Sequence, residues 1–176
     1  MKPTTQPAAD LARFIDHTLL KPEATPQHVE QLCAEAREHD FKTVCVNSGY
    51  VSLAARCLAG SQVGVCAVVG FPLGAMASRS KAFEAQTAIA DGATEIDMVI
   101  AVGRAKAGQW QEVRDDIESV FQACGAIPLK VIFETCLPQK SRGVQLICNI
   151  WDRGFGHALP VVIHGSLKRL FVALGG

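Results

Sequence analysis

The chain has 176 residues, 49% of them hydrophobic and 19% charged, with a formal net charge of +0. This length suits one domain with a substantial core, and the neutral charge gives no reason to expect nucleic acid or an anionic membrane surface as a partner. The polar start, with Pro3 and Pro7, lacks the apolar core of a signal peptide, and no apolar run has spanning length. We therefore expect a cytoplasmic protein without a membrane partner.

Cysteine is frequent but irregularly placed. No two of the seven cysteines form a Cys-x-x-Cys pair, and their number is odd. This argues against a disulfide or zinc framework and favours reduced thiols. His157 and His164 are far apart and have no companion ligands, so no metal site is predicted from them.

Short apolar strands alternate with helices from residue 14 onward. The predicted strands occupy residues 14–20, 41–46, 63–69, 94–100 and 129–133. One predicted helix starts at Pro26, and three more occupy about residues 50–58, 80–90 and 110–124. Thr25-Pro26 places threonine at an N-cap and proline at the first helical position, where each is favoured. Residues 70–74 form a glycine-framed loop that matches no phosphate-binding pattern.

This alternation is typical of parallel strands joined by right-handed crossovers. Five units of about 25–30 residues match the repeat of an eight-unit (β/α) barrel of ~250 residues. A doubly wound open sheet is the competing layout. Charged residues inside two strands favour the barrel, whose interior accepts them near its mouth. We predict an α/β fold of TIM-barrel type that is incomplete, with about five of the eight units.

Two of the predicted strands carry charges where a buried strand is normally apolar. Strict alternation directs Glu95 and Asp97 into the barrel, and the apolar residues between them toward the helices. Lys130 opens the next strand and could meet Asp97 there. A buried amine loses its proton more readily, and carbonyl chemistry needs a neutral amine. The alternatives are a carboxylate satisfied by a structural cation and a lysine whose head lies in solvent.

Polar residues also interrupt the first strand, where Asp16-His17-Thr18 is unusual for a core segment. The alternative is a strand end that faces solvent. His17 alone is more often a satisfied core histidine than a catalytic one. Cys45, in the middle of the second strand, is expected to be a small core residue.

The regular alternation ends after Cys136. Residues 137–143 are rich in helix breakers, 144–151 are strand-like, and 152–157 are loop-like. Residues 159–164 are predicted as a further strand and 167–174 as a short amphipathic helix. We therefore divide the chain into a lead-in at 1–13, a partial barrel at 14–137 and a divergent tail at 138–176.

Five motifs in this order closely resemble those of the deoxyribose-phosphate aldolases, over about residues 11–137. They are Ile15-Asp16-His17-Thr18-Leu19-Leu20-Lys21-Pro22, Val44-Cys45-Val46-Asn47, Val68-Val69-Gly70-Phe71-Pro72-Leu73-Gly74, Glu95-Ile96-Asp97-Met98-Val99-Ile100 and Leu129-Lys130-Val131-Ile132-Phe133-Glu134-Thr135. The combination is far more specific than any one motif.

The resemblance implies a class I aldolase, a lyase that reversibly cleaves 2-deoxy-D-ribose 5-phosphate to D-glyceraldehyde 3-phosphate and acetaldehyde through a lysine Schiff base. It implies no cofactor and no metal, a phosphorylated sugar as substrate, and a homo-oligomer as a compatible assembly. By motif match, Asp97 is the proton-shuttling carboxylate and Lys130 the active-site lysine that is not covalent. Asp16, Thr18 and Cys45 match pocket-lining positions.

One departure from the family is severe. The Schiff-base lysine of the family lies on the sixth strand in a Val-Lys-Thr-Ser-Thr-Gly-Phe pattern, which this sequence does not contain. The seventh-strand lysine and the serine-rich phosphate site of the eighth strand are also unmatched. A truncation or frameshift near Leu137 would explain this, and an inactive, poorly stable product is expected. The alternative function is a non-catalytic fragment that acts at most as a binding or assembly module.

Overall fold

The computed structural model describes residues 11–133, together with the backbone of residues 161–165 and 168–171. The predicted strand at 144–151, the loop at 152–157, most of the lead-in and the boundary at Leu137 lie outside these residues. Within them, no helix is long and apolar enough to cross a membrane.

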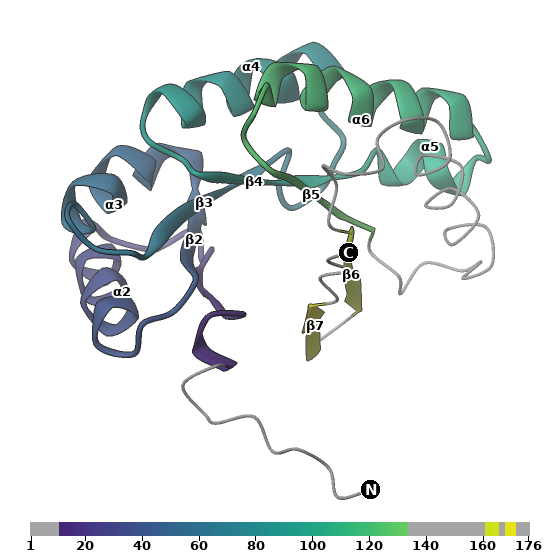
Figure 1. The fold of residues 1–176 in the computed structure, drawn as a ribbon. Helices are drawn as coiled ribbons and strands as arrows, with labels where there is room; N and C mark the ends of the chain where they lie inside the picture. Colours follow the sequence, from purple (N-terminus) through teal and green to yellow (C-terminus); the bar gives the residue numbers. More distant parts are fainter. Residues whose placement is uncertain (1–10, 134–160, 166–167, 172–176) are drawn as a thin grey trace, which may run out of the picture.

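The fold is a sheet whose strands follow one another in chain order (Figure 1). The first five strands pair in parallel. They are β1 (Asp16–Leu19), β2 (Thr43–Asn47), β3 (Gly64–Val69), β4 (Glu95–Val99) and β5 (Leu129–Ile132). Each lies within its predicted segment or extends one residue beyond it.

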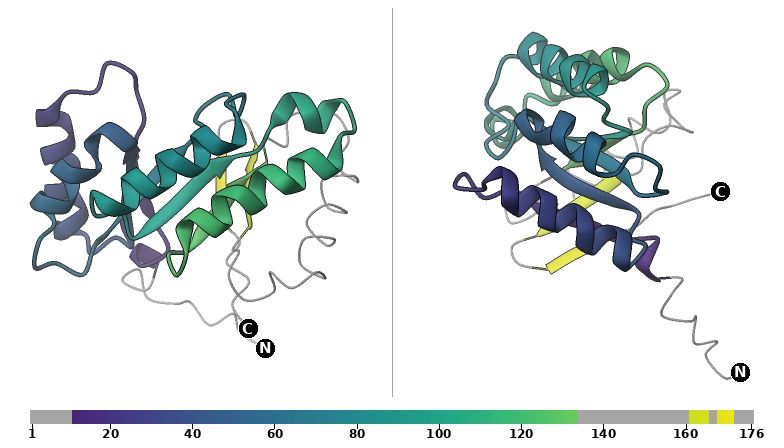
Figure 2. Two further views of the ribbon diagram at one scale, coloured as in Figure 1. Left: turned by 90° about the horizontal axis from the view of Figure 1, so that it is seen from above. Right: turned by 90° about the vertical axis from the view of Figure 1, so that its left-hand side faces the viewer.

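The helices cover the outer face of this curved sheet (Figure 1, Figure 2). They are α2 (Pro26–Glu38), η1 (Ser48–Tyr50), α3 (Val51–Cys57), α4 (Ser78–Ala90), α5 (Val102–Lys106) and α6 (Trp110–Cys124). A doubly wound sheet would reverse its strand order and carry helices on both faces. The sequential order and the single helical layer therefore identify the predicted (β/α)-barrel type of α/β fold, represented here by five parallel strands.

The end of the described chain departs from that pattern. β6 (Val161–Gly165) pairs in parallel with β5, and β7 (Lys168–Phe171) pairs antiparallel with β6. The predicted strand at 159–164 is confirmed over residues 161–164, whereas the helix predicted at 167–174 is wrong for the described residues 168–171, which form β7. An isolated helix of that length is marginally stable, because its first turn fixes the backbone of several residues for one hydrogen bond. Pairing with β6 gives residues 168–171 backbone hydrogen-bond partners instead.

The apolar core lies between the sheet and its helices. In α2, four residues at helical spacing share one face and are buried: Val29, Leu32, Cys33 and Ala36. The predicted N-cap is confirmed: the Thr25 hydroxyl accepts a hydrogen bond from the backbone N–H of His28, and the His28 ring accepts one from Thr25.

A buried ion pair joins α4 to α6 inside this layer. Lys81 Nζ lies 2.6 Å from Asp116 Oδ2 and donates a second hydrogen bond, 2.9 Å long, to the carbonyl oxygen of Val99. The two charged side chains are 0% and 2% exposed. Because Val99 ends β4, this pair fixes the carboxyl end of that strand against both helices.

Replacing Lys81 with Met should lower the free energy of unfolding by about 3–5 kcal/mol, because it leaves the Asp116 carboxylate buried without a cation. The double variant Lys81→Met/Asp116→Leu should recover most of the loss. Urea denaturation measures both. The control is Glu118→Gln in the partly exposed α6 pair Arg114–Glu118, whose ends are 3.6 Å apart; it should change stability by about 0.5 kcal/mol or less. A double variant as unstable as the single one would contradict this account.

Candidate functional site

Charged side chains gather on the inner face of the sheet, opposite the helices. In β4, Ile96 and Met98 belong to the apolar core, and the alternating residues Glu95 and Asp97 project the other way. The register pairs Asp97 with Lys130 of β5. The alternation predicted for β4 is therefore what the structure shows, and its acidic residues face the interior.

Lys130 is the centre of this cluster. Its Nζ lies 2.6 Å from Asp16 Oδ2, 2.9 Å from Glu95 Oε2 and 2.9 Å from Asp97 Oδ1. All four side chains are less than 10% exposed. The structure thus brings together three residues predicted for the site, Asp16, Asp97 and Lys130, and adds Glu95.

Further contacts hold the outer atoms of the cluster. The Thr43 hydroxyl donates a hydrogen bond of 2.6 Å to Asp16 Oδ1, and Lys42 forms an ion pair with Glu95 Oε1. The hydrogen bond between Lys130 and Asp16 has good geometry. The contact with Asp97 Oδ1 is longer, at 2.9 Å, than the contact of 2.6 Å with Asp16 Oδ2.

The environment determines the charge on Lys130. Burial acts to lower the pKa of Lys130, but the neighbouring carboxylates of Asp97, Asp16 and Glu95 outweigh it and raise that pKa above the ordinary value. We expected burial to yield a neutral amine; this reasoning is wrong, because it left the neighbouring carboxylates out. Lys130 is a stable ammonium at neutral pH.

The environment also raises the pKa of Asp97, which for a carboxyl favours the neutral form. Burial raises the pKa of the Asp97 carboxyl above its usual value, although the charge of Lys130 and hydrogen bonds from Lys130 and Cys66 act to lower it. A carboxyl whose pKa lies closer to neutrality exchanges a proton more readily with a bound molecule.

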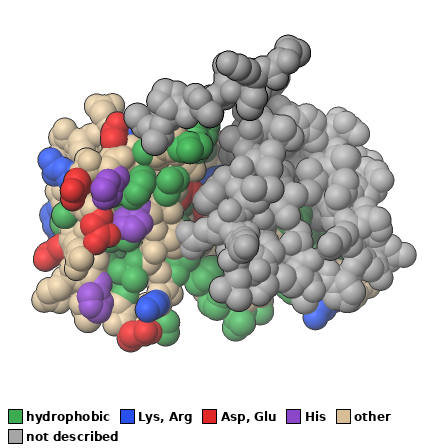
Figure 3. Space-filling model, turned by 90° about the horizontal axis from the view of Figure 1, so that it is seen from below, with side chains coloured by type: hydrophobic (Ala, Val, Ile, Leu, Met, Phe, Trp, Pro, Cys, Tyr) green, Lys and Arg blue, Asp and Glu red, His purple; other side chains and the backbone are tan. Residues whose placement is uncertain are grey.

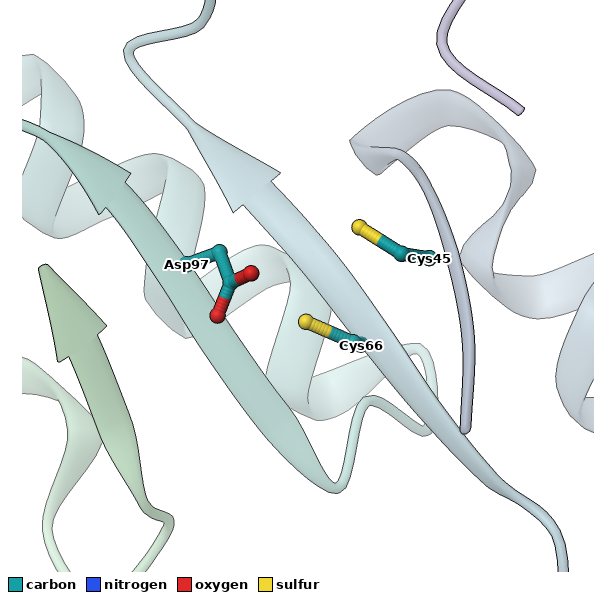
Figure 4. A group of neighbouring side chains, drawn as sticks. All are labelled: Cys45, Cys66 and Asp97. Carbon is teal, nitrogen blue, oxygen red and sulfur yellow. The ribbon is translucent and has the colours of Figure 1, made fainter. Parts of the chain in front are cut away.

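The other predicted residues of the first two strands lie nearby. The half-buried hydroxyl of Thr18 donates a hydrogen bond of 2.8 Å to the backbone oxygen of Asp16. Cys45 is buried in a small inner-face cluster with Cys66 and Val68, as expected for a small core residue. Its sulfur, that of Cys66 and an Asp97 oxygen all lie within 4.8 Å of one another (Figure 4).

His17 projects to the outer side of β1. Its Nε2 lies 2.7 Å from Glu35 Oε2, and its ring packs 5.2 Å from that of Phe41. Both residues belong to the α2 side of the sheet, so His17 is a satisfied structural histidine. It borders a depression of about 300 Å³ beside β1 and α2, and histidine and acidic side chains gather on this part of the surface in Figure 3.

A family model for the DeoC/LacD family aldolases matches residues 11–145. A deoxyribose-phosphate aldolase from Actinobacillus succinogenes is 54% identical over 148 residues, which cover 83% of this chain and 66% of that protein. The same enzyme from Brevibacillus brevis is 57% identical over 128 residues, 73% of this chain and 58% of that protein. The chain therefore spans about three fifths to two thirds of the length of these curated relatives.

The fold comparison agrees with the sequence comparison. The tetrameric deoxyribose phosphate aldolase from Aeropyrum pernix superposes with a TM-score of 0.71 at 30% identity, over 86% of this chain and 63% of that one. The family match covers the five parallel strands and the whole Lys130 cluster. The resemblance predicted from the five motifs is confirmed: this chain belongs to the DeoC/LacD family of aldolases.

Proposed function

We propose that the Lys130 cluster is the proton-transfer half of a deoxyribose-phosphate aldolase site. The reaction is the reversible cleavage of 2-deoxy-D-ribose 5-phosphate to D-glyceraldehyde 3-phosphate and acetaldehyde, and the substrate is a phosphorylated sugar. The observation that carries the proposal is one buried ammonium in contact with three carboxylates, at positions that match the aldolase motifs. The names of the curated relatives support it.

Each residue of the cluster has a role in this proposal. Asp97, whose pKa is raised by burial, accepts a proton and returns it to the substrate. The Lys130 ammonium orients the carboxylate and stabilises negative charge that develops next to it. Asp16, fixed by Thr43, holds Lys130 in place. Thr18 and Cys45 line the substrate pocket in this proposal.

The covalent step requires another amine. A Schiff base forms from a neutral amine, and the neighbouring anions keep Lys130 protonated. No Val-Lys-Thr-Ser-Thr-Gly-Phe segment occurs in the sequence. We therefore propose that the 176-residue chain does not catalyse the reaction alone, and that it acts at most as a binding or assembly module in that form. A homo-oligomer and a cytoplasmic location belong to the same proposal.

A chimera tests the assignment of Asp97. Residues 11–133 replace the matching segment of the Actinobacillus succinogenes aldolase, which supplies the rest of the barrel. The chimera should be active, and Asp97→Asn should lower kcat about 100- to 10,000-fold, because a positioned proton donor contributes that much. Asp91→Asn, at an exposed position, is the control. An active chimera that is indifferent to Asp97→Asn would refute the proposed role.

Borohydride trapping tests the charge state of Lys130. The 176-residue chain is incubated with 2-deoxy-D-ribose 5-phosphate or acetaldehyde and sodium borohydride, and modified peptides are identified by mass spectrometry. We expect no reduced adduct on Lys130, whereas the Actinobacillus succinogenes enzyme treated in parallel should carry one on its own covalent lysine. An adduct on Lys130 would overturn the argument from charge. Turnover with an adduct on another lysine would overturn the proposed inactivity and leave the aldolase assignment standing.

Replacing Lys130 with Met should lower the free energy of unfolding by about 3–5 kcal/mol at pH 7, since three carboxylates lose their cation. The pKa of Lys130 is raised in the folded state, so its contribution is fully present below the unfolded pKa of about 10.5 and is lost only as pH rises above that value. The loss in the variant should shrink at about pH 4–5, where the uncompensated carboxylates take up protons. Urea unfolding at pH 7 and at about pH 4–5 measures the loss of unfolding free energy in the variant, and Lys106→Met, at an exposed position, is the control. An equal loss at the two pH values would contradict this prediction.

A further inference from the structure

Two thiols and a carboxylate converge on the inner face of the sheet (Figure 4). Cys45 of β2 and Cys66 of β3 are direct partners in the parallel register, and Asp97 of β4 pairs with Val68, two residues beyond Cys66. Cys45 is 4% exposed, Cys66 0% and Asp97 6%. Their ligand atoms all lie within 4.8 Å of one another.

We propose that Cys45, Cys66 and Asp97 form a binding site for a thiophilic divalent cation such as Zn²⁺ or Cd²⁺. Cysteine sulfur binds zinc at about 2.3 Å and carboxylate oxygen at about 2.0–2.2 Å, so tetrahedral ligands stand about 3.5–3.8 Å apart. Ligand atoms already within 4.8 Å reach that spacing by side-chain movements of about 1 Å. The fourth position is left to water.

The nearest cation does not prevent this. Lys130 contacts Asp97 Oδ1 at 2.9 Å, but it also contacts Asp16 at 2.6 Å and Glu95 at 2.9 Å. When Asp97 turns to the metal, the ammonium keeps two carboxylates. The three carboxylates outnumber the two lysines beside them, Lys42 and Lys130, so the cluster carries an excess negative charge that favours a further cation.

The binding step is balanced by proton release. One M²⁺ forms two metal–sulfur bonds and one metal–oxygen bond, and the Cys45 and Cys66 thiols each lose one proton to solvent. No oxidant or reductant takes part. Occupation of the site also removes Asp97 from proton transfer, so the metal would act as an inhibitor of the proposed aldolase chemistry. Binding itself does not depend on that proposal.

A Cd²⁺ titration of the full chain tests the site. The thiols are reduced first, and the reductant is removed before Cd²⁺ is added. The readout is the ultraviolet thiolate-to-cadmium charge-transfer absorption. We expect a stoichiometric band for the unmodified chain, and a loss of affinity of about 100-fold or more in Cys45→Ser and in Cys66→Ala, since even outer partners of a metal site contribute about 10–100-fold. Cys57→Ser is the matched control, because Cys57 and Cys33 form a second thiol pair; it should bind like the unmodified chain.

Two results would overturn the proposal: no band at equimolar Cd²⁺ in the unmodified chain, or an unchanged band in both site variants. Because Cys66 is fully buried, its replacement could unfold the protein, and circular dichroism checks each variant. X-ray absorption at the cadmium edge needs no variant. Two sulfur neighbours with oxygen would support the site, and a shell of four sulfurs or of oxygen alone would refute it.

Discussion

The ion pair between Asp16 and Lys130 constrains the whole sheet. The two residues belong to β1 and β5, which lie four strand intervals apart in a sheet ordered β1-β2-β3-β4-β5. At about 4.8 Å per interval, a flat sheet would separate them by about 19 Å, yet Nζ and Oδ2 are 2.6 Å apart. The sheet must therefore curl until its first and fifth strands face each other across the interior. The charged cluster can form only because the sheet is curved.

This interior is costly to build, and that cost explains its composition. An isolated ammonium or carboxylate removed from water loses several kcal/mol of solvation. Lys130 recovers it from three carboxylates, and two of these have a second polar partner, Thr43 for Asp16 and Lys42 for Glu95. The second partner of the third carboxylate, Asp97, is a weaker donor, the thiol of Cys66. Burial raises the pKa of the Asp97 carboxyl, which is the group that we propose to accept a substrate proton or a metal ion.

Local patterns in the sequence were sufficient for much of the fold. The N-cap at Thr25 and the whole of α6 were predicted from turn and helix signals, and alternation correctly divided β4 into an apolar and an acidic face. Contacts across long sequence separations were beyond such patterns. Asp16 and Lys130 are 114 positions apart, and nothing in either strand specifies the partner. Lys81 looks like a solvent-facing lysine on α4 until Asp116 is placed opposite it. α5, with five residues, is too short to show a period.

The predictions that failed share a physical origin, because each assigned a property to a residue or segment without its neighbours. Burial alone makes a lysine neutral, but Lys130 is buried among anions and stays charged. A short amphipathic segment alone favours a helix, but residues 168–171 lie beside β6 and pair with it. For the same reason, the two thiols beside Asp97 cannot be judged one at a time. Cys45 is an ordinary core residue by itself; next to Cys66 and Asp97, it is one of three groups whose ligand atoms lie within 4.8 Å of one another, which is the arrangement on which the proposed cation site rests.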